Sequence, residues 1–99
     1  YKDYPAIMKK KCLNLYPSNA KNLDTTGYKK GDKGNGVLAL KYLLMLAKKK
    51  SMHNINLDKN DIFGAGTQKA VNNILKNHGY SQNGTAGKKF IDLLGNELL

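Results

Sequence analysis

Apolar residues recur at helical spacing in three separate stretches of this 99-residue chain. Within each stretch they recur every three or four positions, singly or as adjacent pairs, which places them on one face of a helix. The stripes are Val37, Leu40, Leu44 and Ala47 in the first, Ala70, Val71, Ile74 and Leu75 in the second, and Phe90, Ile91, Leu94 and Leu98 in the third. The spacing predicts helices over 35–49, about 66–78 and 86–97.

Strand signals are nearly absent, since apolar and polar residues alternate only briefly around Ile55 and Leu57. We therefore expect an all-α fold, a compact three-helix bundle with an extra short N-terminal helix. The extra helix is expected over about 5–15, because Pro5 suits a first helical turn. Its apolar face would carry Met8, Cys12, Leu15 and Tyr16. Residues 1–28 would be either a segment docked on the core, which we favour because this face needs cover, or a linker. The main domain would span 29–99.

The charge is strongly positive, because 17 basic residues, all of them lysine, oppose 7 acidic ones and give a net charge of +10. Such a surface attracts nucleic acid, anionic membranes or the acidic polymers of a bacterial wall. The absence of arginine weighs against nucleic acid, since arginine dominates base and phosphate readout. An AT-rich coding sequence would explain the lysines equally well, as a solvated surface without a partner.

No pattern typical of an active site or a metal site is present. Cys12 is the single cysteine, so we expect a small buried residue, no internal disulfide and no cysteine-based metal site. Asp58, Asn60 and Asp61 do not have the spacing of a calcium loop, and His53 and His78 are interpreted as solvated or capping residues. We expect no enzyme activity in this chain, no metal and no cofactor.

The stretch NDIFGAGT at 60–67 is interpreted as a loop that leads into a helix. Phe63 would pin the loop to the core, Gly64 would let the backbone turn without a Cβ clash, and Thr67 would cap the helix. Gly84 and Gly87 would form a similar loop before the last helix. Gly79 would end the helix expected over about 66–78.

The order of these elements resembles the three-helix peptidoglycan-binding domain attached to many cell-wall hydrolases. The resemblance covers about residues 29–95, and it rests on the matched positions Gly31, Gly34, Phe63, Gly64, Thr67, Ala70, Val71, Gly84 and Gly87. The chain departs from the family pattern at four places. Lys41 replaces a glutamine, Ile74-Leu75 an aromatic-glutamine pair, Asn60-Asp61 an Asp-Gly pair and Phe90-Ile91 a Thr-Trp pair. These departures concern the sugar-contacting surface more than the fold.

The resemblance implies a non-catalytic module that binds peptidoglycan and targets an attached hydrolase, such as a phage endolysin or an autolysin, to the wall. Because the chain opens YKDYPAI without an initiating methionine, we expect a fragment whose catalytic domain precedes residue 1. The location would be extracellular, at the bacterial wall, with anionic wall polymers as further partners and no membrane partner. Contacts are expected along one groove framed by the first loop, the start of the second main helix and the YSQNG turn. The candidate residues are Tyr42, Asn60, Asp61, Tyr80, Gln82 and Asn83.

The alternative is a small basic nucleic-acid-binding domain of the helix-turn-helix type. Residues 67–94 would form two helices, but the stretch HGYSQNGTAGKK between them is longer than the three or four residues of that joint. We therefore prefer the wall-binding interpretation and expect no nucleic-acid partner.

Overall fold

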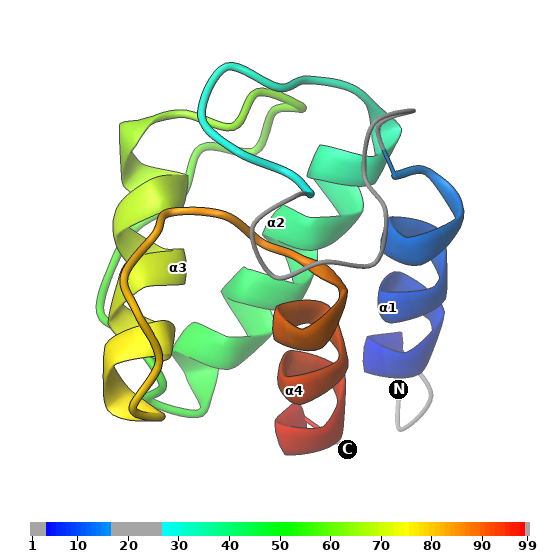
Figure 1. Cartoon of the computed structure of the whole chain (residues 1–99). Coiled ribbons are helices and arrows are strands. Elements are labelled where there is room, and N and C mark those ends of the chain that lie inside the picture. The colour runs from blue at the N-terminus through cyan, green and yellow to red at the C-terminus, as the bar shows by residue number, and fades with distance from the viewer. Residues whose placement is uncertain (1–3, 17–26, 99) are drawn as a thin grey trace.

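The computed structural model describes residues 4–16 and 27–98, and this part of the chain is a bundle of four helices (Figure 1). The helices are α1 (Tyr4–Asn14), α2 (Asn35–Lys49), α3 (Ala65–Asn77) and α4 (Lys88–Leu98). Within the described residues the only β-type pairing is two isolated antiparallel bridges, Tyr28 with Ala86 and Lys33 with Ile62. The all-α prediction with an extra N-terminal helix is therefore confirmed, and each helix begins and ends within about two residues of its expected bounds.

Helix α2 runs through the middle of the bundle and packs against each of the other three helices (Figure 1). Its apolar stripe is completely buried, with Leu40, Leu43 and Leu44 each at 0% exposure. Each such leucine contributes about 1.5–3 kcal/mol relative to an exposed position. The buried faces of α3 and α4 are the predicted ones and complete the same core. No helix in the described part of the chain has the length and apolar character needed to cross a bilayer.

Helix α1 is docked on α2 and α4, so its apolar face is covered. Met8 and Cys12 belong to the core, and burial raises the pKa of the Cys12 thiol to about 12. Leu15, expected on the buried face, is instead 48% exposed, because α1 ends at Asn14 and the chain turns away. Residues 1–3 and 17–26, part of the expected N-terminal segment, lie outside the described residues.

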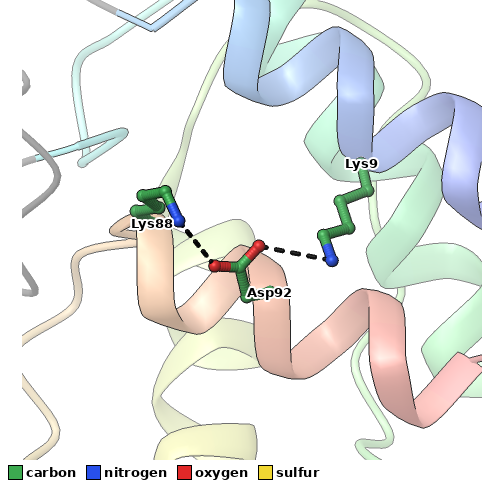
Figure 2. Close-up of polar contacts among 3 residues, drawn as sticks. All are labelled: Lys9, Lys88 and Asp92. Carbon is green, nitrogen blue, oxygen red and sulfur yellow. Dashed lines mark hydrogen bonds and ion pairs between the residues drawn. The ribbon is translucent and has the colours of Figure 1, made fainter.

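An ion-pair network joins α1 to α4 (Figure 2). The two carboxylate oxygens of Asp92 face different lysines, with Lys9 Nζ at 3.3 Å and Lys88 Nζ at 3.0 Å. Burial acts to raise the pKa of Asp92, but hydrogen bonds from Lys88 and Lys9 outweigh it and lower the pKa. Gly95 makes room for this contact, since a Cβ there would overlap the side chain of Lys9.

The NDIFG loop is held to the segment before α2 by three backbone hydrogen bonds. Gly31 N–H donates to the Phe63 carbonyl at 3.0 Å, Phe63 N–H to the Asp32 carbonyl at 2.8 Å, and Gly34 N–H to the Asp61 carbonyl at 3.0 Å. Gly31 and Gly34 both have positive φ, at 101° and 125°, which favours glycine. Phe63 is 1% exposed and pins the loop to the core as predicted.

The predicted roles of Thr67 and Gly64 are wrong. Helix α3 begins at Ala65, two residues before Thr67, so Thr67 lies inside the first turn and is buried at 2% exposure instead of capping it. Gly64 is the N-cap, but its φ of −100° suits any residue and a Cβ there would meet no atom within 4 Å. The first turn of α3 therefore has no side-chain cap.

Two helices end with the chain in the left-handed region. At the end of α3, Gly79 has a φ of 78°, and Tyr80 N–H donates back to the Leu75 carbonyl at 2.8 Å, as expected for a closing glycine. At the end of α2, Ser51 takes the same place with a φ of 63°, and Met52 N–H donates to the Ala47 carbonyl at 3.0 Å. His78 caps α3 through Nδ1, 2.9 Å from the Ile74 carbonyl, as its position predicted.

His53 is not a solvated loop residue, and that interpretation is wrong. It is buried at 7% exposure, with Nε2 2.6 Å from the Leu44 carbonyl and Nδ1 3.0 Å from the Ile55 N–H. A carbonyl can only accept and a backbone N–H can only donate, so Nε2 carries the proton and Nδ1 is bare. This neutral imidazole joins the 52–57 loop to α2.

We expect acidification below the ordinary histidine pKa to destabilise the protein through His53. Burial lowers the pKa of His53 below its ordinary 6.5, an effect that the Leu44 hydrogen bond opposes. The contribution of neutral His53 to the free energy of unfolding is therefore fully present above pH 6.5. It is lost as the pH falls through the folded-state pKa. Urea unfolding between pH 7.5 and pH 5 should show a smaller loss of stability for His53→Gln than for the wild type. Asn54→Gln, a change at the exposed neighbour of His53, is the control and should behave as the wild type, and equal losses in all three proteins would contradict this role.

We expect the second residues of α2 and α3, both glycine, to respond oppositely to alanine. A Cβ on Gly36 would overlap the Tyr28 hydroxyl and lie 2.9 Å from the Leu15 carbonyl oxygen, whereas the nearest atom to a Cβ on Gly66 is the Asn56 carbonyl oxygen at 3.6 Å. Gly36→Ala should lower the free energy of unfolding by about 2 kcal/mol through overpacking. Gly66→Ala should raise it by about 0.5 kcal/mol. Urea denaturation measures both, and a stabilising Gly36→Ala would show that α1 and Tyr28 do not pack on α2 in this way.

Candidate binding site

The predicted contact residues do not lie along one groove but at three separate places. Tyr80 and Asn83 line a cavity between α3 and α4, Asn60 lines a cavity at the start of α3, and Tyr42 lines one between α1 and α2. Asp61 and Gln82 are exposed and line none of the three. The described part of the chain thus offers several small sites in place of a continuous groove.

The cavity between α3 and α4, here the α3–α4 cavity, has a volume of about 240 Å³. Its lining consists of Leu75, Tyr80, Ser81, Asn83, Thr85, Lys89 and Phe90. Leu75 and Phe90 are buried and form an apolar floor, whereas the Tyr80 side chain is 53% exposed at the rim. An apolar floor with a few hydroxyl, amide and ammonium groups at its edge is typical of a ligand site.

The connection between α3 and α4 positions the rim of this cavity. After Gly79 the chain reverses and runs back along α3 before it crosses to α4 (Figure 1). Gly84 N–H donates to Asn72 Oδ1 at 2.8 Å, which ties this return segment to α3. Asn83 Oδ1 accepts the Thr85 N–H at 2.9 Å, so this candidate residue also shapes its own turn.

The glycines of the return segment are structural. Gly84 has a φ of 71°, which favours glycine, and a Cβ there would lie 2.7 Å from Gln68 Nε2, so the Gln68 side chain would have to move aside. Gly87 is buried directly before α4, and its carbonyl accepts the Ile91 N–H at 3.0 Å. Ala86 then pairs with Tyr28 through two backbone hydrogen bonds of 2.8 and 3.3 Å.

The cavity at the start of α3, here the Lys41 cavity, has a volume of about 130 Å³. Its lining consists of Lys41, Asn56, Leu57, Asp58, Asn60, Ile62, Gly64, Ala65, Gly66 and Thr67. Lys41 reaches it from the middle of α2 and is only 2% exposed. The cavity therefore joins a buried cation to the uncapped first turn of α3.

The burial of Lys41 and its bonds to the loop before α3 were not predicted from the sequence. Its Nζ donates to Asn60 Oδ1 at 2.7 Å and to the Ile62 carbonyl at 2.9 Å. Burial lowers the pKa of Lys41, while the charges of Asp58 and Asp61 oppose that change. A signal was present, because Lys41 lies four residues after Val37 and three before Leu44, on the buried stripe of α2.

The cavity between α1 and α2 is mostly apolar and has a volume of about 300 Å³. Tyr42 borders it together with Met8, Lys11, Leu15, Asn35, Leu38 and Ala39. Among the residues that the structure describes, no group of three or more histidine, cysteine or acidic side chains is placed to hold a metal ion.

We expect Lys41 to stabilise the loop before α3. Lys41→Met keeps the aliphatic stem but removes both hydrogen bonds, so it should lower the free energy of unfolding by about 1–3 kcal/mol. Lys41→Gln, which retains a donor, should lose less. Lys49→Met, an exposed lysine on the same helix, is the control and should change stability by less than about 0.5 kcal/mol. Equal stabilities of Lys41→Met and Lys49→Met in urea would contradict this role.

Comparison of the chain with protein-family models, with curated proteins and with solved structures finds no match. The assignment of a function therefore depends on the chemistry of the residues that line these cavities.

Proposed function

We propose that this chain is a non-catalytic module that binds the peptidoglycan of bacterial cell walls and holds an attached hydrolase at its substrate. The observation that carries the proposal is the α3–α4 cavity. Half-exposed Tyr80 stands beside an apolar floor of Leu75 and Phe90, with polar side chains at the rim. Amino sugars and short peptides combine apolar patches with hydroxyl and amide groups, which such a surface complements.

The arrangement of the motif residues supports the resemblance to peptidoglycan-binding domains. The glycine-rich opening at 31–34 and the NDIFG loop are about thirty residues apart in the chain, yet they hydrogen-bond to each other. Phe63 is buried beneath them. The two motif segments thus form one structural unit, and this unit is expected if the resemblance reflects a shared fold.

The lysine-rich surface supports an anionic target. Lysines are exposed at positions 10, 11, 29, 30, 33, 49, 50, 59, 69, 76 and 89. Their attraction to wall phosphates and carboxylates acts over about 8 Å at physiological ionic strength and weakens as salt is added. Contacts inside the α3–α4 cavity depend less on salt, so the two contributions can be separated by experiment.

The module would act by raising the local concentration of its partner domain. Once it is bound, each further encounter between the attached hydrolase and the wall is effectively intramolecular, which raises avidity by about a hundredfold or more. This role requires no catalytic group in the chain itself.

Co-sedimentation with purified Gram-positive cell walls tests the proposal directly. The walls are used before and after removal of teichoic acids, at low and at high salt, with a duplex DNA gel shift in parallel. Retention on stripped walls at high salt is the expected result. Loss of retention on stripping would reduce the module to a lysine-driven tether. DNA binding without wall retention would overturn the proposal in favour of a nucleic-acid-binding domain.

We expect Tyr80→Ala to weaken retention on stripped walls by about tenfold, equivalent to roughly 1.4 kcal/mol. Because Tyr80 is half exposed, the helical content by circular dichroism should be unchanged. Gln82→Ala is the matched control, since Gln82 belongs to the same turn, is exposed and does not line the cavity. Equal retention of the two variants would exclude the α3–α4 cavity as the contact site.

A further inference from the structure

Two opposite charges line the Lys41 cavity without pairing with each other. Lys41 and Asp58 both contribute to its wall, yet no ion pair within 4.0 Å joins them. The charge of Asp58 nevertheless acts to raise the pKa of Lys41 against the effect of burial, so the two groups interact across the space. A cation and a carboxylate thus share one small cavity at a separation too large for direct contact.

Each of these groups retains binding capacity that the described part of the chain does not use. An ammonium has three N–H donors, and Lys41 gives two of them to Asn60 and Ile62. The third has no partner among the described residues. Asp58 is exposed and accepts no hydrogen bond from any of them. Because Lys41 is only 2% exposed, its spare donor cannot be fully hydrated from bulk solvent.

The backbone of the first turn of α3 adds hydrogen-bond donors to the lining of the cavity. Ala65, Gly66 and Thr67 line the cavity, and Gly64 provides no side-chain cap for their N–H groups. These groups have no acceptor within the helix and carry its partial positive charge. Gly64 and Gly66 add no side chain to this part of the lining, where a Cβ on Gly64 would meet nothing within 4 Å and one on Gly66 would lie 3.6 Å from the Asn56 carbonyl oxygen and 3.9 Å from Ile55 Cγ2.

We propose that the Lys41 cavity is a binding site for an α-amino-acid head group, in which an ammonium and a carboxylate share one carbon atom. The ligand carboxylate accepts hydrogen bonds from Lys41 and from the first turn of α3, and the ligand ammonium donates to Asp58. A simple anion would be repelled by Asp58 and a simple cation by Lys41. The volume of about 130 Å³ is the smallest of the three cavities described, which suits a compact head group.

Assigning this head group to a component of the bacterial wall rests on the proposed function. A stem-peptide diamino acid such as diaminopimelate has a far end that, when it is not cross-linked, carries both an ammonium and a carboxylate. Lysine at the same place in a stem peptide offers only an ammonium. The α3–α4 cavity would then contact the bulk of the polymer, and the Lys41 cavity would select this free end. A free amino acid has the same head group and is the other source.

Titration of the ¹⁵N-labelled protein by NMR, with alanine and with acetate as separate probes, tests the site without any wall. Alanine should shift the amide signals of Ala65, Gly66 and Thr67 and bind about tenfold more tightly than acetate, because it gains a charged hydrogen bond to Asp58. Asp58→Asn should remove this preference. Asp61→Asn, an exposed carboxylate of the same loop that does not line the cavity, should retain it. Equal binding of alanine and acetate, or a preference that survives Asp58→Asn, would overturn the proposal.

A second titration distinguishes the two sources. The tripeptide alanyl-γ-glutamyl-diaminopimelate should shift the same signals and bind about as tightly as alanine, whereas alanyl-γ-glutamyl-lysine should bind no more tightly than acetate. Binding of alanine without binding of the diaminopimelate peptide would assign the site to free amino acids and reject the wall peptide. Because these titrations use no wall, failure of the head-group site is distinguishable from failure of wall retention in the sedimentation experiment.

Discussion

Burial of α2 is the constraint on which the rest of this structure depends. The helix contacts all three others, and its three central leucines are completely inaccessible. A small domain gains little stability per residue, so a single helix covered on several sides is an efficient source of apolar burial. The connection between α2 and α3 is anchored to the core at both ends, near α2 by the bond of His53 to the Leu44 carbonyl and near α3 by buried Phe63.

The same burial explains why two polar side chains lie inside the protein. Lys41 lies on the covered side of α2 and needs acceptors, which the loop before α3 provides through Asn60 and Ile62. His53 bonds to the Leu44 carbonyl on the same helix. Buried polar groups without partners are costly, so these contacts specify where the loops lie as well as stabilise them. The Lys41 cavity is a consequence of this arrangement.

Helix α3 borders both of the cavities on which the proposed function rests. Its first turn forms part of the Lys41 cavity, and Leu75 near its last turn forms part of the floor of the α3–α4 cavity. One face of α3 is buried on the core, and its first turn and its last turn each border one of these cavities. A polymer with a repeating backbone and free peptide ends is the type of target that could engage separate small sites on one module.

The sequence by itself determined the helices, their buried faces and the structural use of Phe63 and Gly79, because helical periodicity and left-handed glycine are local properties. Only the tertiary structure decided how the loops meet. Thr67 lost its expected capping role because α3 begins earlier, His53 became a core residue, and the contact residues predicted for one groove were distributed over three cavities. Such outcomes depend on contacts between residues distant in the chain, for which local spacing carries no information.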